Sequence, residues 1–282
     1  MWVLYQNEFI KREDVHIDME DRGYQFGDGV YEVVRVYNGR CFRLIEHTDR
    51  LVASASSILL NLPHTKEEIN AMLEKLVQLN QLGTGYIYLQ YTRGVAPRYH
   101  GFPESTTPVL TAYVKEKPIP EKMLAEGIDV ILAEDIRWLR CDIKSLNLLG
   151  AVLSYEQAKK AGKEEAILHR NQIVTECSLA NIFMIKNKEI ITHPVTTMIL
   201  NGITRRVTLE LADKHGYIVN EREFTVTELL GADEVFATGT TIEVMPVVSI
   251  DDQPVGNRLP GTITKELQAL FANERNSFET RT

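Results

Sequence analysis

Strand-like and helix-like patterns follow one another in an irregular order along these 282 residues, and that order constrains the fold more than any other feature. Residues 31–37 are rich in valine and tyrosine, Asn38-Gly39 follows them, and residues 41–44 form a second, shorter run. An Asn-Gly pair between two such runs is a strong signal for a β-hairpin. Helical patterns come next, without the strict strand–helix alternation of a doubly wound parallel sheet. We therefore expect an α+β (mixed α/β) fold with two domains.

The other expected elements follow from hydrophobic spacing and turn residues. Leu51, Ala55 and Ile58 lie at helical spacing and predict a helix. A second helix is expected to begin at Thr65, because Thr65 and Glu68 make a capping box. The remaining expected strands cover residues 3–5, 9–10, 86–92, 109–115, 129–133, 165–169, 172–175, 181–185, 189–192 and 233–238, and the remaining helices cover 146–161, 205–215 and 262–273.

A polar stretch with two prolines divides the chain. It reads Lys-Glu-Lys-Pro-Ile-Pro-Glu-Lys over residues 115–122. Prolines interrupt helices and strands and are typical of connecting segments. The sequence therefore predicts an N-terminal α/β domain over residues 1–117, an interdomain linker over 118–122 and a C-terminal α/β domain over 123–282.

The charge and the cysteines of the chain exclude several classes of protein. Lys and Arg number 31 and Asp and Glu number 39, which gives a formal net charge of −8, whereas a general nucleic-acid binder needs a basic face. No apolar run approaches the roughly 18 residues of a membrane span. Cys41, Cys141 and Cys177 are odd in number and form no CxxC pair, as is typical of reduced thiols in the cytoplasm. We expect a soluble cytoplasmic protein that binds neither nucleic acid nor membrane.

Several common catalytic motifs are absent from the sequence. It contains no GxxxxGK[ST], HExxH, GxSxG or EF-hand loop, and its seven histidines form no close pair at metal-ligand spacing. Gly27-Asp28-Gly29 begins like a dinucleotide-binding fingerprint, but Glu32 stands where the third glycine belongs. P-loop phosphoryl transfer, hydride transfer through a Rossmann turn and zinc hydrolysis lack their usual residues, and we expect no metal site.

Lys144 and Glu176 stand in segments that could support chemistry. Lys144 has apolar neighbours on both sides, from Trp138 to Leu148, and a loss of hydration would lower the pKa of its amine and make it a nucleophile or a base. A lysine whose stem packs while its charge reaches water gives the same pattern. Glu176 ends a strand-like run, where a carboxylate is usually solvated. Local sequence alone favours a structural role for both residues.

Two segments could hold a phosphate group. Residues 201–204, Asn-Gly-Ile-Thr, precede an expected helix, whose first N–H groups are unpaired and favour anions. Residues 238–241, Thr-Gly-Thr-Thr, offer hydroxyls after an expected strand. Each segment alone is a weak signal, because small polar residues cap helices and turns everywhere. Both segments together with an apolar-flanked lysine are more suggestive of an anion site.

A basic pair lies in the loop after the strand expected at 86–92. Arg98 and His100 are two residues apart, so in an extended loop both side chains point the same way. A guanidinium beside an imidazole can hold a carboxylate, and Arg can bond both of its oxygens. A surface loop held by Pro97 and Pro103 accounts for the pattern equally well.

Three stretches together resemble fold-type IV pyridoxal-phosphate enzymes. They are Glu-Asp-Arg-Gly-Tyr-Gln-Phe-Gly-Asp-Gly-Val-Tyr-Glu at residues 20–32, Asp-Ile-Lys-Ser-Leu-Asn-Leu-Leu-Gly at 142–150 and Thr-Glu at 175–176. Within this group, which is branched-chain-aminotransferase-like, the chain is most similar to the bacterial D-amino-acid transaminases. The likeness runs through nearly the whole chain and is weakest after about Asp251.

The resemblance implies two α/β domains, a homodimer, and pyridoxal 5'-phosphate as the cofactor. It also implies that Lys144, in the C-terminal domain, is the Schiff-base lysine that bonds to the cofactor and transfers the proton. Glu176 matches the acid that pairs with the pyridine nitrogen. The resemblance further implies that the phosphate is held by Arg50, Ile203, Thr204 and Thr240, and the substrate carboxylate by Tyr31, Arg98 and His100.

The implied reaction is transamination between a D-amino acid, such as D-alanine, and a 2-oxo acid, such as 2-oxoglutarate, giving pyruvate and D-glutamate. The implied partners are these small molecules and a second copy of the chain. Two departures stand out, because Leu179-Ala180 and Gly239 occupy positions where the family often has hydroxyls. They imply fewer hydrogen bonds around the phosphate.

Three other functions stay open on the sequence alone. A branched-chain L-amino-acid transaminase would share the lysine, the glutamate and the phosphate contacts and would differ at Arg98 and His100. An aminodeoxychorismate-lyase-like enzyme would release pyruvate without an amino acceptor. A non-catalytic binding module would keep the fold, although the presence of both Lys144 and Glu176 argues against it.

Overall fold

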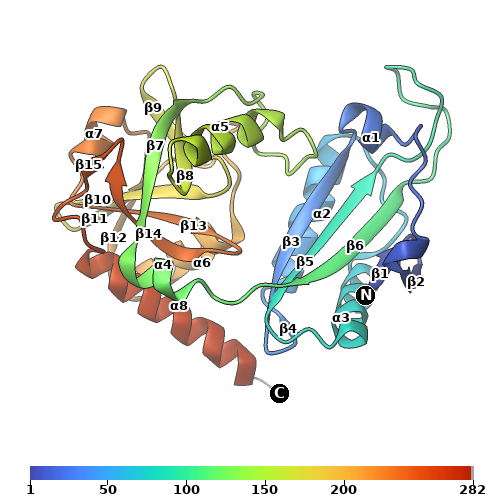
Figure 1. Cartoon of the computed structure of the whole chain (residues 1–282), viewed down its shortest axis with the longest axis horizontal. Coiled ribbons are helices and arrows are strands. Elements are labelled where there is room, and N and C mark those ends of the chain that lie inside the picture. The colour runs from blue at the N-terminus through green and yellow to red at the C-terminus, as the bar shows by residue number, and fades with distance from the viewer. Residues whose placement is uncertain (281–282) are drawn as a thin grey trace. The chain divides into compact units, whose positions relative to one another are not determined.

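The computed structural model describes residues 1–280, which form two compact units of mixed helices and strands (Figure 1). The first unit contains Met1–Pro118 and Ile143–Asn147. The second contains Ile119–Asp142 and the described chain from Leu148 onwards. The expected α+β class is confirmed.

The first unit is built on a six-stranded antiparallel sheet in the order β2-β1-β6-β5-β3-β4. Residues along β5 alternate between the two faces of the sheet, as a period of two requires, with Ile87, Leu89 and Tyr91 in the core. The strands are β1 Trp2–Tyr5, β2 Glu8–Lys11, β3 Gly29–Tyr37, β4 Arg40–Cys41, β5 Gly85–Thr92 and β6 Val109–Glu116.

Two helices, α2 (Leu44–Ser57) and α3 (Lys66–Asn80), cover one face of this sheet. They bury residues at helical spacing, Leu51 and Ala55 from α2 and Leu73 from α3, against the strands. The capping box of Thr65 and Glu68 is present at the start of α3, as the sequence predicts. A 3₁₀ turn, η1 (Arg12–Asp14), and a short helix, α1 (Arg22–Phe26), complete the unit.

The second unit is built on a nine-stranded mixed sheet in the order β12-β11-β10-β13-β14-β7-β8-β9, with β15 paired to β14. Three pairs are parallel, namely β11 with β12, β14 with β7 and β7 with β8. The strands are β7 Ile128–Glu134, β8 Glu165–Arg170, β9 Ile173–Cys177, β10 Asn181–Lys186, β11 Glu189–Thr192, β12 Ile218–Glu221, β13 Glu234–Gly239, β14 Glu243–Ile250 and β15 Gln253–Pro254.

Helices connect two of these parallel pairs, because parallel neighbours need a long crossover. Helix α5 (Leu149–Lys160) links β7 to β8, and α6 (Ile203–Lys214) links β11 to β12. Helix α5 buries Ala158 against Ala133 of β7 and Leu168 of β8. The other helices of the unit are α4 Glu121–Glu126, α7 Val226–Leu230 and α8 Thr262–Thr280.

The segment around Lys144 differs from the prediction in two ways. The helix expected over 146–161 begins only at Leu149, because residues 144–146 pair with the start of β3 instead. Leu146 N donates to the Gly29 carbonyl at 3.0 Å, and Ser145 forms a bridge with Val30. Lys144 therefore packs within the first unit, whereas the sequence predicted it in the C-terminal domain. The domain boundaries at residues 117 and 123 stay a prediction.

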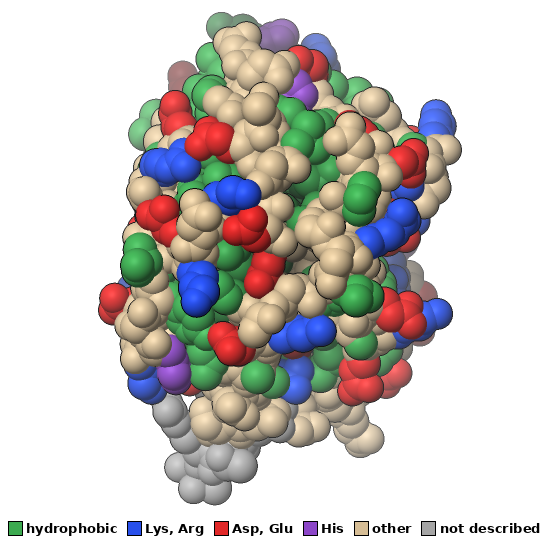
Figure 2. All heavy atoms as spheres, turned by 90° about the vertical axis from the view of Figure 1, so that its left-hand side faces the viewer, with side chains coloured by type: hydrophobic (Ala, Val, Ile, Leu, Met, Phe, Trp, Pro, Cys, Tyr) green, Lys and Arg blue, Asp and Glu red, His purple; other side chains and the backbone are tan. Residues whose placement is uncertain are grey.

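The surface of the described chain carries mixed charge. Figure 2 shows acidic and basic side chains interspersed over the face that it displays. No helix within residues 1–280 is both long enough and apolar enough to cross a bilayer.

Candidate active site

Lys144 lies against the ring of Tyr31 in the first unit. Its Nζ is 4.3 Å from the centre of that ring. The backbone holds the pair in place, because Tyr31 N donates to the Lys144 carbonyl at 3.0 Å and Lys144 N donates to Ser54 Oγ at 3.2 Å. Lys144 is only half-buried. The amine is thus fixed at its base and still open to a small molecule.

Glu32, next to Tyr31 on β3, is a buried carboxylate that binds two residues of α2. It accepts from Arg50 Nε at 2.6 Å, from Arg50 Nη2 at 2.9 Å and from His47 Nδ1 at 2.8 Å. Burial raises the pKa of Glu32, but Arg50 and His47 outweigh it and hold that pKa below its ordinary value. Arg50, the expected phosphate residue, is therefore held in one orientation by an ionised partner.

His47 completes this group. Burial lowers its pKa, Glu32 opposes that effect, and the charges of Arg50 and Lys144 lower the pKa further. A neutral His47 then donates its Nδ1–H to Glu32, since a carboxylate can only accept. Sequence reasoning missed His47 as a site residue and gave Glu32 no role. The signal was the spacing of His47 and Arg50, three residues apart on one helix face.

Glu176, at the end of β9 in the second unit, is buried with three hydrogen-bond donors around it. It accepts from Arg137 Nη1, from Asn181 Nδ2 at 2.9 Å and from Leu200 N at 3.1 Å. Burial raises the pKa of Glu176, and the Arg137 guanidinium and the Leu200 N–H oppose that rise. The local sequence suggested a solvated carboxylate, whereas in the structure Glu176 is buried and held by three hydrogen bonds.

Arg137 stands between Glu176 and a second acid, Asp135. Its Nε and Nη2 donate to Asp135 at 2.9 and 2.8 Å, and Arg170 lies 3.1 Å from the same carboxylate. Burial raises the pKa of Asp135, but the bonds from Arg137 and Arg170 bring it to about 2. Two acids and two arginines balance each other here. None of Asp135, Arg137 and Arg170 was singled out from the sequence.

Asn181 joins Glu176 to the expected phosphate segment. Its Nδ2 also donates to the Leu200 carbonyl at 2.7 Å, just before α6. Gly202 fits this contact because a Cβ there would lie 2.2 Å from Asn181 Oδ1. Ile203 and Thr204 then form the first turn of α6, and no side chain caps that turn. Its N–H groups can therefore face an anion.

The second expected phosphate segment follows β13. Thr240 is half-buried there, next to Gly239. A Cβ on Gly239 would lie 3.7 Å from the Cβ of Ala180. Gly239 and Ala180, two of the positions where the resemblance leads us to expect a hydroxyl, are therefore neighbours. Thr240 is the remaining hydroxyl that the resemblance assigns to this place.

Arg98 and His100 occupy a different part of the first unit. Both are exposed, and both pack on Phe26 of α1, with Arg98 Cζ 5.0 Å and the His100 ring 5.5 Å from its centre. Within residues 1–280, no described contact joins either of them to Tyr31 or Lys144. The structure therefore gives the expected carboxylate-binding residues two separate sets of contacts, with Arg98 and His100 on Phe26 and Tyr31 beside Lys144.

Cys141 is buried near Arg137. Burial raises the pKa of Cys141 to about 11, although Arg137 works against the rise. Cys141 N donates to the Thr197 carbonyl at 2.8 Å, so this cysteine fixes a turn. Among the described residues, no cluster of three or more His, Cys, Asp or Glu side chains could hold a metal ion.

A fixed lysine amine, a buried carboxylate beside an arginine and a helix start open to an anion are the groups that pyridoxal phosphate needs. Residues 29–250 match the family model described as amino-transferase class IV. The chain belongs to this family.

Its relatives are similar over nearly their whole length. The D-alanine aminotransferase of Listeria monocytogenes serotype 4b (strain F2365) is 52% identical over 277 residues, which cover 97% of this chain and 96% of that protein. The D-alanine aminotransferase of Bacillus licheniformis is 49% identical over 273 residues, with the same coverage.

Solved structures of branched-chain aminotransferases share the fold at lower identity. The Escherichia coli enzyme is 26% identical, with a TM-score of 0.92 over 96% of this chain and 93% of that one. The enzyme of the archaeon Thermoproteus uzoniensis, solved with norvaline, is 25% identical, with a TM-score of 0.90 over 97% of this chain and 94% of that one. A third such enzyme, solved with pyridoxamine 5'-phosphate, is 26% identical, with a TM-score of 0.90 over 96% of this chain and 93% of that one.

Proposed function

We propose that this chain is a pyridoxal-phosphate-dependent transaminase that exchanges the amino group between D-alanine, or a similar D-amino acid, and a 2-oxo acid such as 2-oxoglutarate. The products are pyruvate and D-glutamate. The observation that carries the proposal is the 52% and 49% identity to D-alanine aminotransferases over 97% of the chain. The branched-chain enzymes of the same fold are only 25% or 26% identical.

Lys144 carries the covalent and proton-transfer steps in this proposal. Pyridoxal phosphate, when bound, supplies an electron sink for the pair left at the substrate Cα. The Lys144 amine would hold the cofactor covalently, and in its free form it would remove and return the substrate Cα proton as base and acid. Its fixed backbone and the Tyr31 ring at 4.3 Å limit where the amine can reach.

Glu176 would supply a negative charge to the pyridine nitrogen. Its three hydrogen bonds fix the orientation of the carboxylate, and the Arg137 guanidinium favours its ionised form. Arg50, the N–H groups of Ile203 and Thr204, and the Thr240 hydroxyl would hold the phosphate. The buried pair with Glu32 keeps the Arg50 guanidinium ready for this role.

We also propose a homodimer in which the substrate carboxylate is held by Tyr31, Arg98 and His100. Arg98 and His100 are exposed and have no described contact with Tyr31. This supports an arrangement in which their loop serves the Tyr31 and Lys144 of a second copy. A cytoplasmic location remains a prediction, to which the three free cysteines of the described chain are suited.

A substrate panel tests the reaction. The purified protein with added cofactor is given D-alanine or L-leucine with 2-oxoglutarate, and pyruvate or 4-methyl-2-oxopentanoate is measured. We expect faster turnover of D-alanine, and pyruvate only when an amino acceptor is present. Faster turnover of L-leucine would reject the stereochemistry, and pyruvate without an acceptor would indicate elimination. Inactivity of a cofactor-loaded protein on every substrate would indicate a binding module.

Mixing two variants that have each lost most of their kcat/KM, assayed at a D-alanine concentration below KM, tests the shared site. Lys144→Ala lacks the amine, and Arg98→Met lacks the guanidinium. If the loop acts on the partner, a mixed dimer has one site with both groups, and random mixing recovers about a quarter of the wild-type activity. If both groups act within one chain, mixing recovers nothing.

A further inference from the structure

Asp28, which lies between two glycines in the stretch 20–32, joins two buried arginines. It accepts from Arg22 Nε at 2.8 Å and from Arg93 Nε at 2.8 and 3.0 Å. The exposed fractions of the three side chains are 11% for Asp28, 4% for Arg22 and 6% for Arg93. One carboxylate is therefore shared by two guanidinium groups that cannot lose their protons, and the group of three keeps a net positive charge. The proposed reaction gives this group of three no role.

Arg22 extends from Asp28 to the loop that contains Arg98 and His100. Its Nη1 donates to the Tyr99 carbonyl at 2.6 Å, midway between the two. Its Cζ lies 4.8 Å from the centre of the Phe26 ring, on which Arg98 and His100 also pack. Arg22 thus fixes both the backbone of the loop and the ring beneath its basic side chains.

Arg93 holds the same loop at its two ends. Its guanidinium lies 3.8 Å from the centre of the Phe102 ring and donates to the carbonyls of Leu59 and Ile58 at 3.0 and 2.7 Å. Its own carbonyl accepts from Thr106 Oγ1 at 2.9 Å. The start and the end of the loop are therefore tied to one buried arginine, whose position depends on Asp28.

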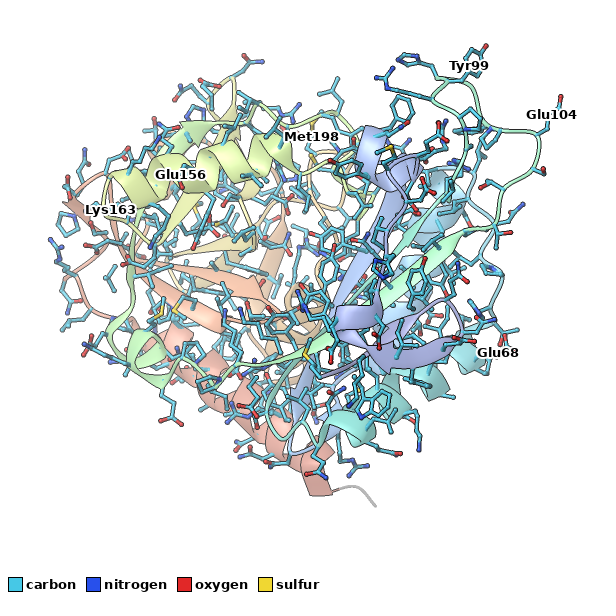
Figure 3. The ribbon with its side chains drawn as sticks, turned by 45° about the vertical axis from the view of Figure 1, so that its right-hand side comes forward. Glu68, Tyr99, Glu104, Glu156, Lys163 and Met198 are labelled. Carbon is cyan, nitrogen blue, oxygen red and sulfur yellow. The ribbon has the colours of Figure 1, made fainter. Side chains whose placement is uncertain are left out.

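The outer part of the loop has little else to hold it. Residues 97–100 are all exposed, and Figure 3 shows Tyr99 and Glu104 at its outer end, pointing away from the sheet. Flexible surface loops lose conformational entropy when they bind a ligand, and fixing them beforehand reduces that loss. The contacts of Arg22 and Arg93 provide this fixation.

We infer that Asp28 is a positioning residue, which orders the 94–106 loop through Arg22 and Arg93 and so tightens the binding of substrate carboxylates by Arg98 and His100. The inference rests on the proposed function, because it needs those two residues to bind the carboxylate. Asp28 itself touches neither the substrate nor the cofactor in this account.

Asp28→Asn tests the inference, since it keeps the shape and removes the charge. We expect KM for D-alanine and Kd for propionate, a carboxylate without an amine, each to rise about tenfold, while kcat changes less than threefold. The slow half-reaction with isopropylamine, which has no carboxylate, should keep its wild-type rate, and so should the absorbance spectrum of the bound cofactor. A purely structural defect would lower the rates with both amines and change the spectrum.

Asp252→Asn is the matched control, because Asp252 forms an exposed ion pair with Lys163 in the second unit. It should leave all five measurements unchanged. If Asp28→Asn does not fold, Phe102→Leu serves instead. Phe102 is 55% exposed, so its replacement should not disturb the core, and the change removes only the aromatic ring that packs on the Arg93 guanidinium. An unchanged Kd for propionate in the folded variant overturns the inference.

Arg98→Met separates this inference from the proposed function. Weaker propionate binding in Arg98→Met but wild-type binding in Asp28→Asn refutes only the positioning role. Wild-type propionate binding in Arg98→Met, or no D-alanine turnover by the wild-type protein, refutes the proposed function itself.

Discussion

Replacing Glu32 with glutamine should destabilise the cofactor-free protein by about 3 kcal/mol at pH 7. Removal of one partner of a buried ion pair costs roughly 3–5 kcal/mol, because the other charge stays buried and unpaired. Glutamine can still accept one hydrogen bond from Arg50, whose side chain is 11% exposed, so we expect the lower end of that range. The NH2 group of the glutamine would also face an N–H donor of Arg50 or His47, whose hydrogen bond the Glu32 carboxylate accepts in the wild type.

The pH dependence of this loss has a definite sign. The pKa of Glu32 is depressed in the folded protein, so its stabilisation is complete above the unfolded value near 4.5 and is lost as the pH falls toward the folded value. The free energies of unfolding of the two proteins should therefore differ at pH 7, where the stabilisation by Glu32 is complete. Below pH 4.5 that difference should shrink.

Thermal unfolding followed by circular dichroism measures the effect. A loss of about 3 kcal/mol corresponds to a fall in Tm of roughly 6–12 °C for a protein of this size. The control is Glu156→Gln, an exposed glutamate of α5 that lies 3.9 Å from Lys160 and is labelled in Figure 3; its Tm should not change. An equal Tm for Glu32→Gln and wild type at pH 7, or a difference that persists unchanged to pH 3, would refute the reasoning.

Three further predictions concern the reaction. Lys144→Arg should lower kcat about 10³-fold or more, and borohydride should fix the cofactor to the peptide containing Lys144 in the wild type only, as mass spectrometry would show. Arg98→Met should lower kcat/KM for D-alanine by about 10–100-fold through loss of a charged hydrogen bond, measured by steady-state kinetics, whereas an unchanged KM would contradict its role. Cys141 should resist thiol reagents in the native protein, because a pKa of about 11 leaves only about one thiol in a thousand ionised at pH 8; Cys141→Ser should keep its activity, and rapid inactivation of the wild type would contradict the burial argument.

The parts of the fold that the sequence predicted are those with strong local patterns. The hairpin of β10 and β11 pairs as expected across residues 186–189, and the capping box starts α3. Strand β14 was missed, since all eight of its residues are buried and Pro246 lies within it. A strand between two neighbours in a sheet need not alternate, and a proline within a run argues against a central strand. Strand β14 is recognised only from its pairing with β13 and β7 in the folded sheet.

The site was less accessible to local reasoning. Lys144 and Glu176 came from resemblance, because their neighbours in sequence favoured a structural role. The groups around them join residues that are far apart, such as Glu32 with Arg50 and Arg137 with Glu176. Such ion pairs have no fixed spacing, so they appear only after folding. The two-residue spacing of Arg98 and His100 predicted that their side chains point the same way, and both pack on Phe26. That spacing holds no information on where the pair lies relative to Tyr31.

The five residues Ile143–Asn147 pack with a unit to which neither of their flanking segments belongs. The chain consequently passes from one unit to the other three times, after Pro118, Asp142 and Asn147. No single cleavage can then yield two complete halves. A fragment that begins at Ile119 would keep Lys144 while lacking β3, against whose Tyr31 ring it lies. Truncation or recombination at any one crossover would separate Lys144 from β3 or divide the second unit.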